Sequence, residues 1–397
     1  MSDKTTRRII EEIVASIDIP PSAYEKAEAR YTDLGEWFGR PEAKCASFDP
    51  HVYSQGSFRL GTVVRREEYD LDFGCRLRRS VSKSTHTQKQ LKALVGMDME
   101  DYRKARRIER ALQEKPRCWR LQYTDELSFH MDCVPSIPEE DSQRQLLVEA
   151  LVSAGSADVQ ARSVAGFAGS ITDNRLPNYE IISPQWRTSN SEGYALWFES
   201  RMKLAMAFLE NRALEARAAK VDDLPARNWK SPLQHSVKAL KRHRDVMFKD
   251  DPDGQPISII ITTLAAAAYE GEQDTASTVA NILARMGSFV RKTKPRVPNP
   301  VNPVEDFADK WYDPKYAQLD LENKFWQWLE QAQNDFQIIG ESRDAGFIAE
   351  QIQAKFGSVP DARSLEGKLG LGAVSVITAP KSHAIVEPPA RPWMRTA

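Results

Sequence analysis

The sequence is short of the features that mark secreted, membrane-spanning or zinc-binding proteins. It has only four cysteines in 397 residues, with no C-x-x-C pair and no Cys/His spacing typical of a zinc site. We therefore expect reduced, mostly buried thiols. The longest apolar stretch, residues 257–269, is interrupted by Thr262 and Thr263 and is shorter than the ~20 residues that cross a bilayer. The 55 basic and 56 acidic residues nearly cancel, so no overall charge recruits nucleic acid.

What is present is the composition of a globular protein, with 41% hydrophobic and 28% charged residues. The length exceeds one ordinary domain of ~100–200 residues, which predicts two packed units. The amphipathic N-terminal segment does not resemble a signal peptide. We therefore expect a cytoplasmic protein with no membrane partner.

A strand with two carboxylates on one face is predicted at residues 69–77. Apolar residues alternate there with Asp70, Asp72, Gly74 and Arg76, which is the period of a half-buried strand. Asp70 and Asp72 would lie ~6.6–6.8 Å apart along that face. The alternative is a solvated edge strand, on which Asp70 and Asp72 would be ordinary surface residues without a function. Residues 118–123 and 127–134 predict a β-hairpin of the same sheet around a turn at 124–126.

The hairpin supplies a third carboxylate. Asp132 lies within an apolar strand, where an unpaired charge would be costly, whereas Asp125 and Glu126 fall in the solvated turn. Carboxylates are the ligands that Mg²⁺ prefers, and two such ions clamp the attacking and leaving oxygens of a phosphoryl transfer. The pattern predicts a two-metal site held by Asp70, Asp72 and Asp132.

A candidate phosphate-binding turn precedes the acidic strand. Gln55, Gly56 and Ser57 open a predicted short helix. Backbone N–H groups at a helix start, together with the Ser57 hydroxyl, suit the β,γ-diphosphate of a nucleotide. Ser57 could equally be only a turn residue or a helix cap.

Helical periodicity dominates the rest of the chain. Residues 5–17 predict one amphipathic helix, and a capping box at Ser22 starts another. The second half predicts a series of helices at residues 191–219, 232–248, 258–270, 275–290, 316–335 and 343–355. The domains expected are a core at 1–190, a helical domain at 191–378 and a flexible Pro-rich tail at 379–397. Residues 76–117 hold 13 basic and 5 acidic side chains, which is most typical of a solvated helical surface.

Taken together, the run from His51 to Leu77, Asp132 and the helical second half resemble the bacterial cGAS/DncV-like nucleotidyltransferases (CD-NTases). The resemblance implies an α+β fold, in which a polymerase-β-like nucleotidyltransferase core with a mixed sheet joins a helical C-terminal domain and the active site lies in the cleft between them. It also implies catalysis by Asp70, Asp72 and Asp132 with two Mg²⁺ or Mn²⁺ ions. In the family, a helix lysine and a serine that opens the next helix hold the donor triphosphate. Lys238 and Ser258 occupy the matching places, and Lys241 lies one turn on from Lys238. Lys238 could instead be an ordinary helix lysine.

The family function implied is the joining of ATP and/or GTP into a cyclic dinucleotide or trinucleotide messenger of CBASS anti-phage defence, which a downstream effector binds. Some members are conjugated through a C-terminal glycine or alanine by a ubiquitin-transferase-like partner, and this chain ends in Ala397. Activation by DNA is not expected, because the Cys/His zinc insertion of the animal enzyme is missing. The alternatives are a linear nucleotidyltransferase acting on RNA or protein, and a non-catalytic nucleotide-binding scaffold.

Overall fold

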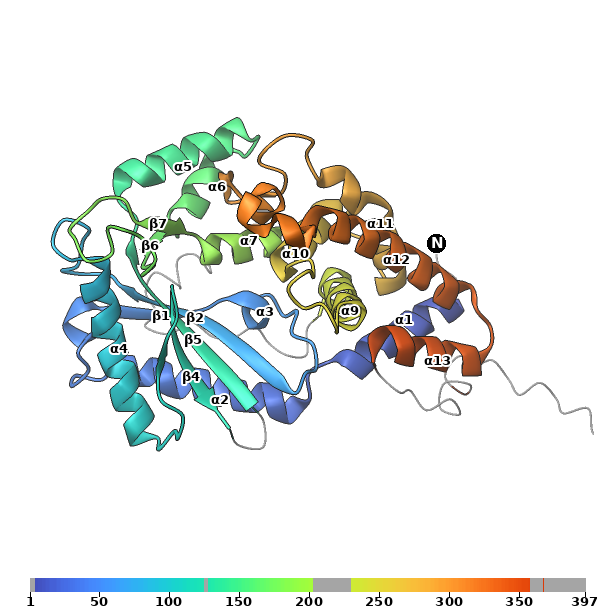
Figure 1. The fold of residues 1–397 in the computed structure, drawn as a ribbon, viewed down its shortest axis with the longest axis horizontal. Coiled ribbons are helices and arrows are strands. Elements are labelled where there is room, and N and C mark those ends of the chain that lie inside the picture. The colour runs from blue at the N-terminus through green and yellow to red at the C-terminus, as the bar shows by residue number, and fades with distance from the viewer. Residues whose placement is uncertain (1–3, 125–127, 203–229, 358–366, 368–397) are drawn as a thin grey trace, which may run out of the picture.

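The computed structural model describes the chain except residues 1–3, 125–127, 203–229, 358–366 and 368–397. A twisted sheet with flanking helices forms one half, and a group of helices forms the other (Figure 1). The predicted turn at 124–126, the end of the helix predicted at 191–219 and the predicted tail at 379–397 lie wholly or partly outside the described residues. Among the described helices, none has both the length and the apolar character of a bilayer span.

The sheet is mixed, because β2 pairs in parallel with β5 and antiparallel with β1. Its main path runs β1-β2-β5-β4-β3, and β6 extends it from β5 to β7. The strands are β1 (Pro50–Ser54), β2 (Glu68–Leu77), β3 (Gln113–Glu114), β4 (Trp119–Tyr123), β5 (Ser128–Pro138), β6 (Gly169–Ile171) and β7 (Arg187–Ser189), with a separate ribbon of β8 (Pro298–Asn299) and β9 (Asn302–Asp306).

The alternation predicted for residues 69–77 is confirmed, and β2 is a central strand rather than an edge strand. One face of β2 is fully buried through Leu71, Phe73, Cys75 and Leu77. These side chains belong to a core that also contains residues of helices α2 (Pro21–Gly39) and α4 (Gln88–Ala105). The opposite face of β2 is left to carry Asp70 and Asp72.

The second half is helical, as predicted, and has its own hydrophobic core. All four cysteines are free thiols, and Cys45, Cys75 and Cys133 are buried in the sheet half, as expected. The remaining helices are α1 (Lys4–Ile17), α3 (Gly56–Arg59), α5 (Asp141–Ser153), α6 (Asp158–Ala165), α7 (Ser191–Arg201), α9 (Pro232–Met247), α10 (Ser258–Ala268), α11 (Thr275–Arg285), α12 (Leu321–Glu341) and α13 (Ala345–Phe356).

Helix α1 packs with the C-terminal helices rather than with the sheet (Figure 1). Its apolar stripe, which includes Ile9, Ile13 and Ile17, is buried in the same core as residues of α9, α11 and α12. The first helix of the chain therefore contributes to the helical half. The domain division at residue 190 stays a prediction, since the two cores are not separated strictly along the sequence.

Buried ion pairs join the two halves. Arg59 of α3 pairs with Glu199 of α7, and Arg76 of β2 pairs with Glu192 of α7 at 2.6 Å. Each of these side chains is at least nine-tenths buried. Helix α3 and the residue that follows it are also held by both cores, because Phe58 of α3 packs into the sheet core and Leu60 into the helical core. The short segment 56–60 is thus fixed from two sides.

Several predicted helix boundaries are wrong. Helix α2 begins at Pro21 with no side-chain cap, so there is no capping box at Ser22; proline already has the φ angle of a first helical residue. Helix α11 ends at Arg285 and continues as a 3₁₀ turn. The helix predicted at 316–335 begins at Leu321, because Asp320 takes a left-handed conformation with φ of 49°.

Replacing Ile13 by alanine is expected to lower the free energy of unfolding by about 2–5 kcal/mol, because it leaves a cavity in a packed core. Urea unfolding followed by circular dichroism measures this. Glu11→Ala, on the exposed face of the same helix, is the matched control and should change stability by less than ~0.5 kcal/mol. Equal, small effects of both substitutions would show that α1 is not part of the helical core.

Candidate active site

Parallel pairing of β2 with β5 brings the predicted carboxylates together. In the register of the two strands, Asp72 is the direct partner of Asp132. Asp70 precedes Asp72 by two residues and therefore lies on the same face of β2. Asp70 is exposed, Asp72 is half-buried and Asp132 is buried. The structure thus places all three residues on one patch of the sheet.

The surroundings of Asp72 in this patch raise its pKa. Burial, and then the negative charges of Asp132 and Asp70, raise the pKa of Asp72 from its ordinary value of 3.8 to about 7. Like charges disfavour the ionised form of a carboxyl group, and a cation beside them would reverse the effect. The patch is therefore a site with excess negative charge.

Arg120 of β4 partly neutralises this patch, and the sequence predictions missed it. Its Nε and Nη2 donate to the two carboxylate oxygens of Asp132, each at 2.7 Å, and Nη2 lies 4.0 Å from Asp70 Oδ1. The antiparallel register places Arg120 directly opposite Asp132. A hairpin with the predicted turn at 124–126 would place Cys118 opposite Asp132, whereas the observed register pairs Tyr123 with Phe129 and so brings Arg120 there. His130 adds a second contact to Asp70, at 3.3 Å from Nδ1 to Oδ1.

The donor set of this patch fits a divalent cation. Hard carboxylate oxygens with a surplus of negative charge are what Mg²⁺ and Mn²⁺ prefer, and the Arg120 guanidinium already stands in as a cation between Asp132 and Asp70. In the described part of the chain, no three acidic, histidine or cysteine side chains converge closely enough to form a complete metal cluster. Asp132 would have to exchange Arg120 for a metal ion.

The Gly56–Ser57 turn lies directly against Asp72. Gly56 has φ of +61°, and a Cβ built on it would come within 2.3 Å of Asp72 Oδ2. Only glycine allows this close approach of backbone to carboxylate. The Gln55 N–H donates to the Asp72 carbonyl oxygen at 2.8 Å, which holds the turn on β2. The structure therefore brings Gly56 and the acidic patch together, as predicted.

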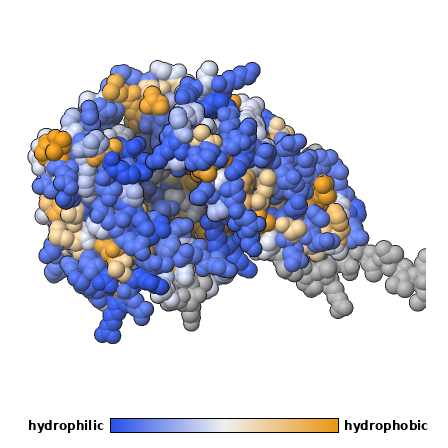
Figure 2. All heavy atoms as spheres, viewed as in Figure 1, coloured by the Kyte–Doolittle hydropathy of each residue, from blue (hydrophilic) through white to orange (hydrophobic). Residues whose placement is uncertain are grey.

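Two adjoining cavities open beside this turn, and both are lined by Gly56, Leu60 and Ile259. The smaller cavity, of about 250 Å³, is lined by Asp70 and Asp72, whereas Asp132 lines neither cavity. The larger one, of about 460 Å³, extends toward β7, α7 and the β8–β9 ribbon. Figure 2 shows a hollow in the largely hydrophilic surface between the sheet half and the helical half. The smaller cavity is lined by Ser57, Thr62, Val63, Val64, Arg66, Glu68, Tyr69, Asp70, Asp72, Lys241, Ser258 and Thr262, besides the shared residues.

Of the two candidate lysines, Lys241 lines the smaller cavity and Lys238 does not. The Lys241 ammonium donates to the Thr62 carbonyl oxygen at 3.0 Å. Burial, and then the nearby positive charges of Arg66 and Arg244, lower the pKa of Lys241 to about 7. Lys238 is fully buried and its ammonium pairs with Asp18. The structure therefore gives Lys238 a structural contact instead of the predicted place in the cavity.

Of the other predicted binding residues, Ser57 and Ser258 line the smaller cavity and Gln55 does not. Ser258 is the first residue of α10 and lines the smaller cavity, where its hydroxyl accepts from Arg244 Nη2 at 3.1 Å. Ser57 also lines it. Gln55 lines neither of the two cavities; its side chain lies beside Gly74, on the β1 side of the turn.

Comparison with known proteins relates the chain to one group of nucleotidyltransferases. Residues 50–135 match the family model of the "Cyclic GMP-AMP synthase DncV-like, nucleotidyltransferase domain". A c-di-GMP synthase from Roseivirga ehrenbergii is 26% identical over 354 residues, which cover 87% of this chain and 81% of that protein. These matches confirm the expected resemblance to the CD-NTases, and the chain is a nucleotidyltransferase.

Solved structures of CD-NTases share the fold over nearly the whole chain. CdnG from Bradyrhizobium diazoefficiens, solved in complex with GTP, aligns with a TM-score of 0.61 at 19% identity, covering 92% of this chain and 98% of that one. CdnC from Escherichia coli MS115-1, solved in a complex with HORMA-deltaN, aligns with a TM-score of 0.56 at 12% identity over 91% and 98% of the two chains. The expected α+β fold with a polymerase-β-like core is confirmed.

Asp72→Asn is expected to stabilise the metal-free protein at pH 8 by ~1–3 kcal/mol, allowing for partial solvent screening. Because the pKa of Asp72 is higher in the folded than in the unfolded chain, folding takes up a proton between about pH 4 and 7. The free energy of unfolding of the wild type should therefore fall as the pH rises through this window. That of the Asp72→Asn variant should fall less. Urea unfolding in EDTA at pH 5 and 8 measures the difference.

The matched control for this substitution is Asp253→Asn, at an exposed position, which should not change the pH dependence. If Asp72→Asn lowered stability at pH 8, or left its pH dependence unchanged, then burial and the charges of Asp132 and Asp70 would not raise the pKa of Asp72 as described.

Proposed function

We propose that this nucleotidyltransferase joins GTP, alone or with ATP, into a cyclic dinucleotide by two successive nucleotidyl transfers. The observation that carries the proposal is the register of β2 and β5, which sets Asp72 opposite Asp132 beside a glycine turn and two adjoining cavities. Two similar proteins support GTP as substrate, because one is a c-di-GMP synthase and the other, CdnG, was solved in complex with GTP.

The donor nucleotide binds with its triphosphate in the smaller cavity. Lys241, Ser57 and Ser258 line it and supply a cation and two hydroxyl donors for phosphate oxygens. A phosphate beside Lys241 favours the charged ammonium and so raises the pKa of that lysine again. Gly56 leaves room for the phosphates to approach the backbone. Lys238 supports the site only indirectly, by tying α9 to Asp18.

Asp70, Asp72 and Asp132 would hold two divalent cations, Mg²⁺ or Mn²⁺. When bound, such ions lower the pKa of the attacking hydroxyl and neutralise charge on the α-phosphate and the departing pyrophosphate. The protein orients the two nucleotides in the adjoining cavities. Their translational and rotational entropy is therefore lost on binding rather than in the reaction step. Arg120 has to release Asp132 for this set of ligands to form.

In each transfer, the 2′- or 3′-hydroxyl oxygen of the acceptor nucleotide forms a bond to the α-phosphorus of the donor. The bond from that phosphorus to the bridging oxygen breaks, and pyrophosphate leaves with the electron pair. The hydroxyl proton passes to Asp132. A second transfer within the linear intermediate closes the ring, so two nucleoside triphosphates give one cyclic product and two pyrophosphates.

We infer that the product acts as a second messenger for a downstream effector in CBASS anti-phage defence. Among the similar structures, CdnC is held in a complex with HORMA-deltaN, which supports a regulatory protein partner for members of this fold. For this chain, a ubiquitin-transferase-like partner or another such regulator is proposed. Its C-terminal residues 368–397 lie outside the described part of the structure.

The test is product analysis. The protein is incubated with α-³²P-labelled GTP or ATP and Mg²⁺ or Mn²⁺, and the expected result is a phosphatase-resistant cyclic dinucleotide identified by mass spectrometry. The Asp70→Asn/Asp72→Asn double variant should lose at least ~10³-fold in rate while remaining folded. Asp253→Asn is the control.

Two outcomes would contradict the proposal. Labelled product that is linear and attached to added RNA or protein would assign a linear transferase. A folded protein that binds nucleotide but makes no product, with unchanged biological activity in the double variant, would assign a scaffold.

A further inference from the structure

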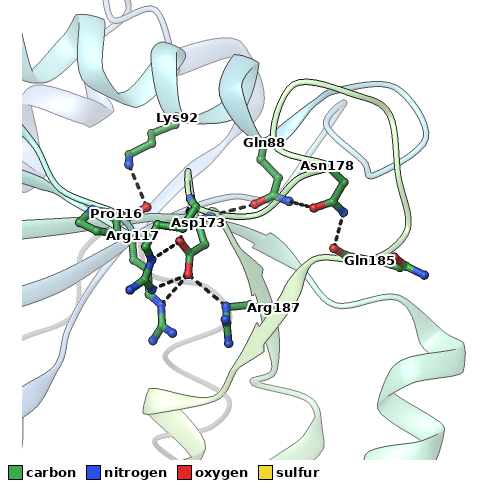
Figure 3. A network of polar contacts seen from close by, with 9 residues as sticks. Gln88, Lys92, Pro116, Arg117, Asp173, Asn178, Gln185 and Arg187 are labelled. Atoms are coloured by element: carbon green, nitrogen blue, oxygen red, sulfur yellow. Dashed lines mark hydrogen bonds and ion pairs between the residues drawn. The ribbon is translucent and has the colours of Figure 1, made fainter. Parts of the chain in front are cut away.

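Three arginines surround one buried carboxylate, that of Asp173, at the edge of the larger cavity. Figure 3 shows Asp173 with Arg117 and Arg187 beside it. Asp173, just beyond β6, is fully buried. Its Oδ2 accepts from Arg117 Nε at 3.1 Å and lies 3.0 Å from Arg187 Nε. Arg175 binds both carboxylate oxygens, at 2.9 and 2.7 Å. This Asp173 cluster is not needed for the chemistry of the acidic patch.

The Asp173 cluster carries surplus positive charge. Burial alone would raise the pKa of Asp173, but the hydrogen bonds from Arg175 and Arg117 hold it well below its ordinary value. One negative charge therefore faces three positive charges. The arginine side chains remain 47%, 58% and 48% exposed for Arg117, Arg175 and Arg187. The cluster thus keeps two positive charges that Asp173 does not balance, and the larger cavity beside it is also lined by one carboxylate, Glu305.

The cluster is held rigidly by buried polar contacts. The Asp173 N–H donates to Gln88 Oε1 at 2.8 Å, and Gln88 itself is fully buried on α4. Lys92, also fully buried, donates to the Pro116 carbonyl oxygen at 3.1 Å, directly before Arg117. Figure 3 shows these contacts on either side of Asp173. The positions of the arginines are set by the scaffold of α4 rather than by free loops.

The cluster opens toward the proposed active site. Arg117 and Arg187 both line the larger cavity, together with Gly56, the residue that lies against Asp72. Both arginines contact Asp173 through Nε. Within the described residues, their terminal Nη groups donate to no protein atom. Pairs of such N–H donors match phosphate oxygens well.

We propose that Arg117 and Arg187 bind the triphosphate of the acceptor nucleotide in the larger cavity, while Arg175 neutralises Asp173. This inference rests on the proposed function, because it needs two nucleotides in the adjoining cavities. It assigns the smaller cavity to the donor phosphates and the Arg117–Arg187 pair to the acceptor phosphates. An acceptor with a 5′-triphosphate is then preferred over a nucleoside.

The test separates donor from acceptor. 2′,3′-Dideoxy-GTP serves as donor, since it has no acceptor hydroxyl. The acceptor is either guanosine or guanosine 5′-(α,β-methylene)triphosphate, which cannot act as donor. The wild type should prefer the triphosphate acceptor by at least ~10-fold in kcat/KM, as expected for charge-assisted hydrogen bonds.

In Arg117→Gln/Arg187→Gln, that preference should fall to about one while transfer to guanosine changes little. This variant keeps Arg175 on Asp173, so it should fold. Arg187→Lys alone should retain part of the preference, since it keeps the charge. Arg162→Gln, which removes an exposed arginine paired with Asp158, is the control. Equal loss with both acceptors would assign a merely structural role, and an unchanged preference would overturn the proposal.

A binding measurement tests the cluster without catalysis. In EDTA, tripolyphosphate should bind to the wild type and to Lys241→Met, and should bind at least ~10-fold more weakly to Arg117→Gln/Arg187→Gln. If the wild type transfers to neither acceptor, the proposed function fails, but this titration still shows whether Arg117 and Arg187 bind phosphate. Equal binding of tripolyphosphate by all three proteins would refute the proposed phosphate site. Preferential use of an RNA oligonucleotide lacking a 5′-triphosphate would assign the larger cavity to RNA instead.

Discussion

The repulsion between carboxylates on β2 and β5 is the constraint on which the rest of the site depends. Parallel pairing makes Asp72 the direct partner of Asp132, and Asp70 adds a third negative charge on the same face. Such a group is costly unless cations neutralise it. Arg120 supplies part of that charge through its two hydrogen bonds to Asp132. A site that costs stability in this way is typical of a functional centre.

Both halves of the molecule contribute residues to the cavities around these carboxylates. The sheet half supplies the carboxylates and the Gly56 turn, and the helical half supplies Lys241 and Ser258. Buried ion pairs such as Arg59 with Glu199 hold the sheet half against the helical half. Because α3 and the residue that follows it pack into both cores, the turn that lies against Asp72 is fixed by both. Two adjoining cavities then give each of two nucleotides its own position.

Much of this could be predicted from the sequence, because it depends on local periodicity. Alternation in residues 69–77 and a hairpin signal identified β2, β4 and β5, and the same patterns placed Asp70, Asp72 and Asp132 on them. Helix ends were less predictable: the left-handed conformation of Asp320 that delays α12 has no counterpart in a hydrophobic pattern.

The unpredicted parts depend on contacts between distant segments. The pairing of Lys238 with Asp18 follows from α1 packing on the C-terminal helices, which the periodicity of residues 5–17 does not contain. The grouping of Arg117, Arg175 and Arg187 around Asp173 likewise joins three separate loop and strand positions. In the sequence, Arg117 is only the end of a basic segment, and its partner carboxylate is 56 residues away.

The most direct test of the central claim is anomalous diffraction from crystals of the protein grown with Mn²⁺ and a nonhydrolysable GTP analogue. The account predicts Mn²⁺ bound to Asp70 and Asp72 in the smaller cavity, with Arg120 no longer bound to both oxygens of Asp132. Mn²⁺ absent from this face of the sheet, with Arg120 still holding Asp132 and nucleotide bound elsewhere, would contradict it.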